Sequence, residues 1–465
     1  MCIRMIAYIS LFIFVSLNIG QTCTIAVVSG KVTEDGRPLL FKTRDERDEY
    51  RQEVKYYKPQ GDENYGHMSV VKWGFSRGSN LYPDVINGAG INDEGLIISN
   101  TTVSGINPAN EITNSNMYLL NYAISHCKNL LEFEELLDSW HTIKKFSTVH
   151  GNFALVDSEG GAAMYEVYAP IQGAKVRWEK FDANSATDRD GNFTGFVVRT
   201  NDNQWSPYSG GAAREKRANE ILRGLVNRGN ISYKSLMRDL ARDVCGDVEK
   251  VDVKALEQEG VKINADLEAK DIHNFFTESC ISRYNTNFAF IGRGIKNDED
   301  KRLINMWVNL GEPSVGIFTP YFPLSKKVPL YAWADKLRNT EDRIEIIDEN
   351  STSLMNNLIV NVGELSAYEN IQSILDPLGL IVLKGVDKYV DYSRVLEIQN
   401  WVFPTEDIII EKTEKFLNDL RTNIVEISDE LLYSFSEYSL NFAYDDYEKI
   451  DKAMPLQFRE WNFKY

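Results

Sequence analysis

Cys23 is the residue whose type and position most directly suggest chemistry. It follows an N-terminal stretch that starts with Arg4, continues with an apolar run over residues 5–17 and ends with small residues. This order is typical of a cleaved export signal, and the run is shorter than the roughly 20 apolar residues of a membrane span. We therefore expect residues 1–22 to be a signal peptide, with an uncleaved anchor as the alternative. The mature protein would be exported, periplasmic or secreted, and would begin at Cys23.

An N-terminal cysteine would carry a free α-amine beside its own thiol. The amine titrates near pH ~8 and the thiol near pH ~8.5, so the amine can take the thiol proton directly or through one water. Nucleophile and base then lie in one residue, as is known for N-terminal threonine. This arrangement explains how a hydrolase could work without a catalytic histidine.

Other fates of Cys23 compete with this one. A structural or disulfide-bonded cysteine is the commonest. A lipid anchor is less favoured, because residues 20–22 lack the upstream leucine that lipid attachment prefers and a strand pattern begins at once. Cys2 could be exposed by loss of the initiator methionine, but the apolar segment behind it argues against this.

The remaining cysteines and the histidines predict no metal site. At most one disulfide can form among Cys127, Cys245 and Cys280, and Cys127 lies in an apolar helical pattern typical of a core. Their spacing fits no zinc motif, and the five histidines do not cluster in the sequence. We expect no metal and no cofactor.

The residues after Cys23 predict a β-hairpin over 23–45. An apolar strand pattern at 23–29 is followed by turn residues at 33–36 and by a second strand at 38–43. In such a hairpin residue 23 lies across from about residues 45–49, so Asp45 can approach the start of the first strand. The carboxylate could orient the terminal ammonium. The alternative is a charged, salt-bridged strand end, because Lys42 and Arg44 flank it.

Further elements follow from hydrophobic spacing. Apolar residues recur at helical spacing over 116–140, and helical patterns are also predicted for 212–226, 232–244 and 405–440; strands are predicted within 151–168 and at 196–200, 287–291 and 304–308. Strands near both ends with helices between them suggest a layered α+β sandwich. The more acidic, more helical part after about residue 330 is treated as an extension, because no linker separates it.

Charge and composition exclude some classes of function. The chain has 465 residues and a net charge of −17, without a basic stripe. Such a field repels polyphosphate, so nucleic-acid binding is disfavoured. No repeat or low-complexity segment is visible, and the sequence leaves homo-oligomerisation open.

Several segments resemble one known group in the expected order. CTIAVVSGKVTEDGRPLLFKTRD (23–45) is similar to the N-terminal motif of the linear-amide hydrolases of the N-terminal-nucleophile (Ntn) superfamily, which include choloylglycine hydrolases, penicillin V acylases and acyl-CoA:6-aminopenicillanate acyltransferases. GINDEGLIISN (90–100), GNFALVDSEGGAAMYEV (151–167), RTN (199–201), REKRA (214–218) and MWVNLGEPSVGIFTPYFP (306–323) resemble later segments of this group. The resemblance spans about residues 23–325.

The resemblance implies a four-layer αββα sandwich and a set of site residues. Cys23 is the implied nucleophile, Asp45 the orienting carboxylate, Asn201 an oxyanion-side amide and Arg214 a charge partner. Asn100 is a looser match on the substrate or oxyanion side. Without the resemblance, Asn201 reads as a turn residue and Arg214 as a surface helix residue, and Asn100, which begins a glycosylation sequon, reads as a loop residue.

The chain departs from the family's Arg-Asn-x-Asp motif at two positions. Lys42 stands where the motif has arginine, and Thr43 stands where it has asparagine. Lysine lacks the planar fork that binds bidentately. Arg44 could substitute, but we expect it to point to the other face of the strand. The departure concerns this part of the site and the substrate, and leaves the nucleophile unaffected.

Taken together, the sequence predicts a signal peptide over 1–22, a catalytic domain over 23–330 and a helix-rich extension over 331–465 packed on that domain. The expected activity is hydrolysis of a small-molecule linear amide. A dipeptidase and an acyltransferase of the same superfamily remain as alternatives, as does an exported binding or structural protein in which Cys23 is inert. We expect no membrane span in the mature protein.

Overall fold

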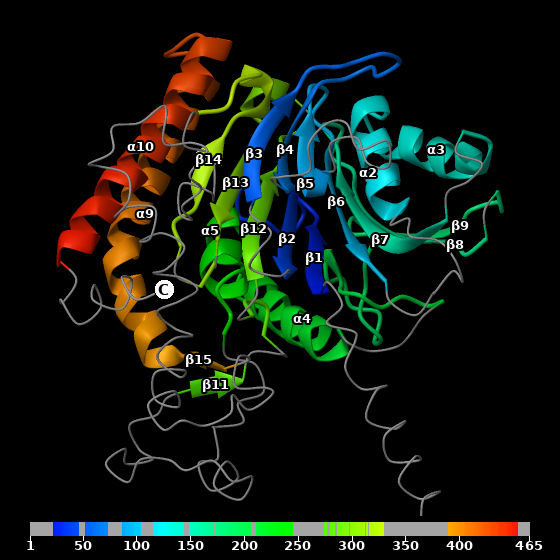
Figure 1. Cartoon of the computed structure of the whole chain (residues 1–465), viewed down its shortest axis with the longest axis horizontal. Coiled ribbons are helices and arrows are strands. Elements are labelled where there is room, and N and C mark those ends of the chain that lie inside the picture. Colours follow the sequence, from blue (N-terminus) through cyan, green and yellow to red (C-terminus); the bar gives the residue numbers. More distant parts are fainter. Residues whose placement is uncertain are drawn as a thin grey trace, which may run out of the picture.

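The computed structural model describes residues 22–45, 52–72, 86–103, 115–143, 148–171, 173–205, 211–244, 274–276, 280–283, 286–296, 298–311, 313–314, 316–329 and 389–453. It has a mixed α+β fold with two antiparallel sheets and a helical C-terminal part (Figure 1). Nearly all of the expected signal peptide, Cys2, Cys245 and the segment 330–388 lie outside the described residues.

The first sheet has six strands in the order β10-β1-β2-β12-β13-β14. These strands are β1 (Thr22–Val28), β2 (Leu39–Asp45), β10 (Phe196–Arg199), β12 (Thr286–Arg293), β13 (Asn305–Leu310) and β14 (Thr319–Tyr321). The three later strands predicted from the sequence are confirmed as β10, β12 and β13, with ends that differ by one or two residues.

The predicted hairpin is confirmed as the antiparallel pair of β1 and β2. Its turn contains Gly36 with φ of +73°, a conformation that a residue without a Cβ adopts at little cost. Cys23 lies opposite Arg44, and Thr22 lies opposite Asp45. The partner of Cys23 is therefore one residue closer to the turn than the expected range of 45–49.

The second sheet has seven strands arranged in chain order. They are β3 (Gln52–Tyr57), β4 (His67–Lys72), β5 (Ile86–Asn92), β6 (Ile97–Thr102), β7 (Val149–Val156), β8 (Ala162–Ala169) and β9 (Arg177–Asp182). The two strands predicted within residues 151–168 are confirmed as β7 and β8. A separate pair joins β11 (Asn274–Phe276) and β15 (Tyr389–Asp391).

The helices are α2 (Ser115–His126), α3 (Leu130–Ile143), α4 (Ala212–Asn227), α5 (Tyr233–Ser235) with a π-helical turn at Leu236–Leu240, α9 (Tyr392–Arg421) and α10 (Asp429–Ala453). The helical spacing over 116–140 belongs to two helices rather than one. Asn129 starts the second, because its Oδ1 accepts a hydrogen bond from the main-chain nitrogen of Glu132 at 3.0 Å. The pattern over 405–440 likewise covers two helices, separated near Asn423, which has φ of +55°.

Buried apolar side chains form three clusters that relate the sheets to the helices. One cluster draws on both sheets and includes Ile25 and Val27 of β1. A second combines the six-stranded sheet, including Ala26 and Val28, with α4 and parts of α9 and α10, and a third combines the seven-stranded sheet with α2 and α3. Alternate residues of β1 thus enter different clusters, as expected of a strand covered on both faces.

Candidate active site

Cys23 lies near the start of β1, between β10 and β2 in the six-stranded sheet. Its side chain is 4% exposed and forms no disulfide. Its main-chain nitrogen donates a hydrogen bond to Oδ1 of Asn201 at 2.8 Å. Asn201 follows β10, and the pairing of Ile25 with Arg199 brings the two residues together. A fixed acceptor therefore lies at the nitrogen that would become the α-amine of a chain beginning at Cys23.

The side-chain amide of Asn201 is oriented by its neighbours. Its Oδ1 also accepts from Nη2 of Arg214 at 3.0 Å, and its Nδ2 donates to the main-chain oxygen of Thr102 at 2.7 Å. Exchanging O and N would set donors against the donors of Cys23 and Arg214. Asn201 therefore presents an acceptor to Cys23, which suits holding an amine. The resemblance implied an oxyanion-side amide, which would have to present a donor.

Arg214 comes from the first turn of α4 and is 1% exposed. Its Nη1 donates to the main-chain oxygen of Cys23 at 2.9 Å and lies 3.7 Å from Oδ2 of Asp45. The helix can approach β10 because Gly211 precedes it: a Cβ at Gly211 would lie 2.0 Å from Oγ1 of Thr200. The alternative of a surface helix arginine is therefore wrong.

Asp45 lies at the end of β2 and is buried. Its Oδ1 accepts from the hydroxyl of Thr286 at 2.6 Å, and its Oδ2 accepts from Nη1 of Arg283 at 3.0 Å. The guanidinium of Arg214 connects this carboxylate to Cys23. Asp45 is thus close to the start of β1, as the hairpin spacing predicts, and it is ion-paired. Its role in orienting a terminal ammonium stays a prediction.

Lys42 and Arg44 lie on the face of β2 opposite to Asp45. Directly paired residues of antiparallel strands share a face, and Arg44 pairs with Cys23 while Lys42 pairs with Ile25. Ile25 belongs to the cluster shared by the two sheets, so the thiol, the lysine and Arg44 point toward the second sheet. The expectation that Arg44 points away from the face of Lys42 is wrong, because residues two apart in a strand point the same way.

Lys42 is 1% exposed, and its Nζ donates to the main-chain oxygen of Asn100 at 2.7 Å. Burial lowers the pKa of Lys42, because it disfavours the charged ammonium. The charge of Cys23 and a side-chain hydrogen bond with it act in the opposite direction. Arg44 adds to the lowering of this pKa, and Asp45 opposes it.

Asn100 is a buried residue of β6, so its interpretation as a loop residue is wrong. Its Nδ2 contacts the sulfur of Met117 at 3.9 Å. Gly88, with φ of +108°, marks where the polar groups meet: a Cβ there would lie 3.4 Å from Oδ1 of Asn100, 3.5 Å from Cε of Lys42 and 3.7 Å from Nη1 of Arg44. The amide, the lysine and the guanidinium therefore gather around one glycine.

Three residues of this region were missed in the sequence. Thr286 and Arg283 bind Asp45, and Asn152 of β7 positions the segment that carries Asn201. The Nδ2 of Asn152 lies 3.0 Å from the main-chain oxygens of both Thr200 and Asp202. Thr286 and Arg283 lie outside the segments that resemble the family, whereas Asn152 lies within 151–167 but was given no role there. A buried asparagine in a strand is a weak signal, since such amides are usually hydrogen-bonded.

Cys127 is buried in the cluster formed with α2 and α3, which confirms it as a core residue. Burial raises the pKa of its thiol to about 12, so it remains protonated and unreactive near neutral pH. Within the described ranges, no group of His, Cys, Asp and Glu side chains could hold a metal ion. Of the helices that the structure describes, none has the length and apolar character needed to cross a bilayer.

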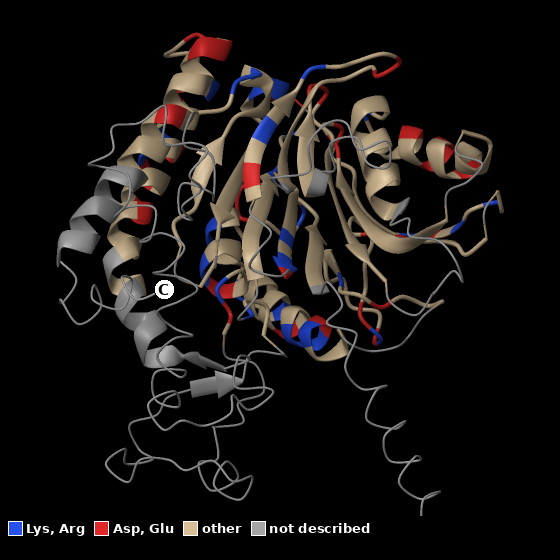
Figure 2. Ribbon diagram, in the orientation of Figure 1, with Lys and Arg blue, Asp and Glu red and all other residues tan. Residues whose placement is uncertain are grey.

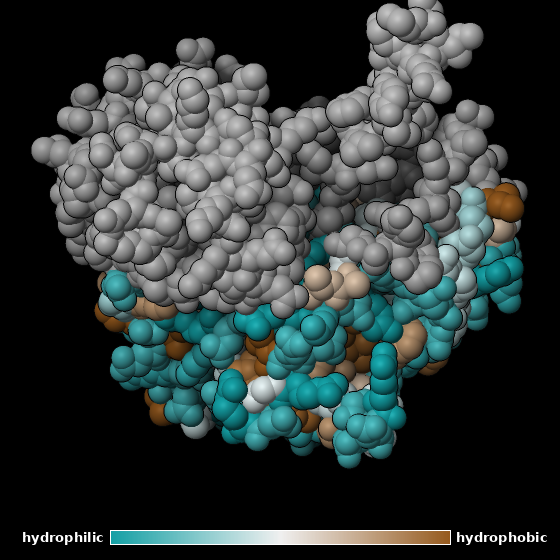
Figure 3. Space-filling view, turned by 90° about the horizontal axis from the view of Figure 1, so that it is seen from below, coloured by the Kyte–Doolittle hydropathy of each residue, from teal (hydrophilic) through white to brown (hydrophobic). Residues whose placement is uncertain are grey.

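Charged side chains concentrate where the end of β2 approaches α4 (Figure 2). Seen from below, the described surface is mainly hydrophilic, with apolar residues scattered between (Figure 3). Exposed large apolar side chains such as Leu131, Ile171 and Phe193 come from different segments. Such scattered side chains are normal for a protein surface.

Comparisons with known proteins leave the family open. The sequence matches no family model and no curated protein. Among solved structures, the chain is similar to two variants of the conjugated bile acid hydrolase from Clostridium perfringens, with identities of 11% and 9% and TM-scores of 0.31 and 0.32. Each match covers 62% of this chain and 89% of the other chain. Similarity at this level does not establish a shared activity.

Proposed function

We propose that this protein is an exported cysteine amidohydrolase that cleaves a linear amide bond through an acyl-enzyme on Cys23. The proposal takes Cys23 as the first residue of the mature chain, after removal of residues 1–22. The observation that carries it is the placement of the Cys23 nitrogen, which donates to the side-chain Oδ1 of Asn201 at 2.8 Å while Arg214 binds both residues. An α-amine at that place would be oriented beside its own thiol.

The reaction begins with attack of the Cys23 thiolate on the amide carbonyl carbon. The developing oxyanion needs donors, and the groups on the thiol face that can supply them are Nδ2 of Asn100 and the guanidinium of Arg44. Each well-placed donor of this kind typically contributes about 3–4 kcal/mol. The weak acceptor now beside Nδ2 of Asn100, the Met117 sulfur, would be exchanged for the oxyanion at little cost.

The α-amine, which took the proton of the Cys23 thiol, returns a proton to the leaving amine, and water then releases the acyl group as an acid. Asn201 and Arg214 orient the α-amine through these steps, and Asp45 orients Arg214 from the other side of the strand. The chemistry proposed here uses only groups of this chain. The substrate is a small-molecule amide.

The four-layer αββα arrangement and the domain division belong to the same proposal. The three apolar clusters support the order helix, sheet, sheet, helix, because one is shared by both sheets and the other two join each sheet to helices. We place the catalytic domain at residues 23–330 and the helix-rich extension at 331–465. Buried residues of α9 and α10, such as Val402 of α9 and Leu432 of α10, enter the same clusters as the sheets, which supports a packed extension.

The test combines the N-terminal sequence of the exported protein with hydrolysis of a panel of acyl amides and dipeptides. We expect a start at Cys23 and release of free acid from acyl amides. Cys23→Ala should reduce hydrolysis to background, because it removes the nucleophile. Cys127→Ala is the matched control, since it removes another buried thiol without touching the site.

Each other outcome selects a different function. Cleavage of dipeptides alone would favour a dipeptidase, and transfer of the acyl group to an added amine would favour an acyltransferase. A mature chain that starts upstream of Cys23, or a Cys23 sulfur found in a disulfide, would contradict the proposal and leave an exported binding protein.

A further inference from the structure

We propose that Lys42 is itself a catalytic residue, whose ε-amine takes the proton of the Cys23 thiol and later returns a proton to the leaving amine. This inference rests on the proposed function for its turnover step. It goes beyond that function by assigning the proton transfer to a side chain of β2 in addition to the α-amine of the first residue.

The geometry around Lys42 supports this role. The pairing of β1 with β2 sets Lys42 and the Cys23 thiol on one face, as diagonal neighbours on adjacent strands. A hydrogen bond from Nζ to the main-chain oxygen of Asn100 at 2.7 Å keeps the amine in place. Lys42 is buried, so solvent does not compete for its hydrogen bonds.

The groups facing Lys42 are few and can be named. Cys23 of β1 and Arg44 of β2 lie on its face of the sheet, whereas Asp45, on the other face, acts on it only through its charge. Asn100 of β6 offers a main-chain carbonyl oxygen, and Gly88 of β5 leaves room for Cε of Lys42. Burial and Arg44 favour the neutral amine, and a neutral amine has a lone pair that can accept a proton. Arginine at this position could not serve in this way, because a guanidinium stays protonated in proteins.

The step balances without any added reactant. The S–H bond of Cys23 breaks and an N–H bond forms on Nζ, which leaves a thiolate beside an ammonium. The thiolate electron pair forms the S–C bond to the amide carbon, and the carbonyl π pair moves to oxygen. When the tetrahedral intermediate collapses, the C–N bond breaks and the departing nitrogen takes the proton from Nζ of Lys42. Cys23 then carries the acyl group as a thioester, and Nζ of Lys42 is neutral again. Water can now hydrolyse the thioester.

The experiment compares the exported protein with Lys42→Met and Lys42→Arg. The rate of Cys23 alkylation by iodoacetamide is measured across pH ~5 to ~10, together with kcat and KM on the best amide of the panel. In Lys42→Met the midpoint of the alkylation profile should rise by about one to three pH units, because the thiolate loses its partner. In Lys42→Arg the fixed positive charge should keep the midpoint low, whereas kcat should fall about a hundredfold or more, in line with the usual contribution of general acid–base groups.

The matched control is Lys31→Met in the same hairpin, where an exposed lysine binds the main-chain oxygen of Asn184. It should leave both measurements unchanged. An unchanged alkylation midpoint in Lys42→Met, or full recovery of kcat in Lys42→Arg, would overturn the inference, because the lysine would then act by charge or packing alone. Should Lys42→Met fail to fold, Lys42→Arg decides alone through kcat.

Failure of the proposed function itself looks different. In that case the wild-type protein hydrolyses no amide and its N-terminus does not begin at Cys23. The alkylation profile still reports whether Lys42 and Cys23 exchange a proton, because it needs no substrate.

Discussion

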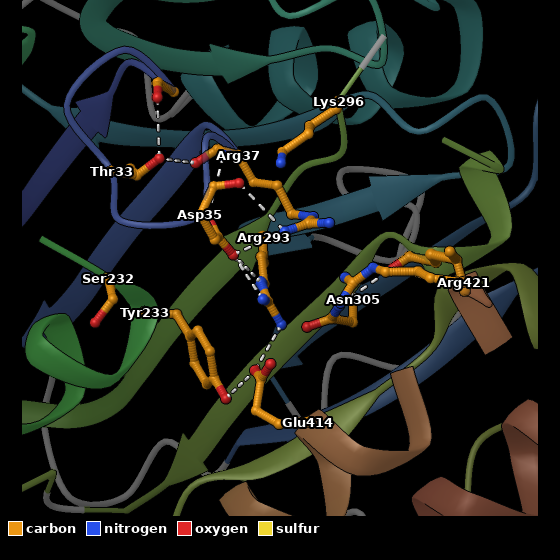
Figure 4. A network of polar contacts seen from close by, with 12 residues as sticks. Thr33, Asp35, Arg37, Ser232, Tyr233, Arg293, Lys296, Asn305, Glu414 and Arg421 are labelled. Carbon is orange, nitrogen blue, oxygen red and sulfur yellow. Dashed lines mark hydrogen bonds and ion pairs between the residues drawn. The ribbon is translucent and has the colours of Figure 1, made fainter. Parts of the chain in front are cut away.

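The hairpin of β1 and β2 carries a charged cluster at each end, and the two clusters differ in composition. At the turn, the network of Asp35, Arg37, Arg293, Glu299, Glu414 and Arg421 sets three guanidinium groups against three carboxylates (Figure 4). At the other end, Lys42, Arg44, Arg214 and Arg283 lie around Cys23 and the carboxylate of Asp45.

In the turn network the charges are paired closely. The side chain of Arg293 is 2% exposed; its Nη2 lies 2.6 Å from Oδ2 of Asp35, and its Nη1 lies 3.0 Å from Oε1 of Glu414. Its Cζ also lies over the ring of Tyr233, 4.6 Å from the ring centroid. Nε of Arg37 donates to Glu299 at 2.9 Å. Because Glu414 and Arg421 belong to α9, the network joins the hairpin and β12 to this helix. Such an arrangement stabilises a contact between distant segments.

The cluster around Cys23 has a different character. It brings a buried lysine and three guanidinium groups close to a free, buried thiol. Cationic groups beside a sulfur are typical of reactive cysteines. The comparison teaches that a network of closely paired charges suits structure, whereas a cluster that sets cations beside a thiol suits chemistry.

The largest expected effect is on stability and tests the turn network. Arg293→Met should lower the free energy of unfolding by about 3 kcal/mol, near the low end for breaking a buried ion pair. The low end applies because Asp35 and Glu414 are 30% and 33% exposed and can still be hydrated. Denaturant unfolding measures the change. The rate of hydrolysis per folded molecule should stay at the wild-type value. A large loss of activity would contradict the idea that the turn network serves stability alone.

The next effect is on activity and tests the Cys23 cluster. Arg214→Met should reduce kcat/KM at least about a hundredfold, equivalent to ~2.7 kcal/mol, because it releases Cys23, Asn201 and Asp45 together. Steady-state kinetics on the best amide provides the measurement. Arg217→Met is the control, since Arg217 lies one turn further along α4 and binds Asp243 at 2.8 Å. Equal losses of kcat/KM in both variants would mean that any change in α4 lowers activity, and that the contacts of Arg214 with Cys23 and Asn201 have no special role.

Parts of this arrangement could be predicted from the sequence because they depend on local pairing. A short turn sets the register of a hairpin, so the proximity of Cys23 and Asp45 followed directly from spacing. The same local rule, applied consistently, would have placed Arg44 on the face of Lys42. The break between α2 and α3 also had a local signal, since Asn129 followed by Glu132 resembles a helix start.

Other parts depend on contacts between residues far apart in the chain. Arg283 and Thr286 bind Asp45 only because β12 pairs with the side of β2 that faces away from β1. The two paired strands lie more than 200 residues apart in the sequence. Local spacing does not specify that pairing. The orientation of Asn201 was missed for a similar reason, since Thr102 and Arg214, which come from other segments, determine it.

The smallest expected effect concerns acid sensitivity. Burial alone would raise the pKa of Glu414, but Arg293 and the hydrogen bond from Tyr233 outweigh it, so the pKa lies below the ordinary 4.5. Such a carboxylate binds fewer protons when folded, stabilises the protein above about pH 4.5 and loses this contribution as the pH falls. Glu414→Gln should therefore flatten the acid side of the stability curve. Near neutral pH, Glu414→Gln should lower the free energy of unfolding less than Arg293→Met does, because the ion pair between Arg293 and Asp35 remains.

The measurement is the free energy of unfolding at several pH values between about 3 and 7, with the exposed Glu411→Gln of the same helix as the control. Lys42→Met should instead remove a rise in stability that ends near pH 10.5, because a buried lysine with a lowered pKa binds fewer protons folded than unfolded between its folded and unfolded pKa values. The window of Glu414 ends near pH 4.5, so the upper limits of the two windows differ. If Glu414→Gln and Glu411→Gln gave the same acid slope, the turn network would not be the source of the acid response, and its contrast with the Cys23 cluster would lose its electrostatic basis.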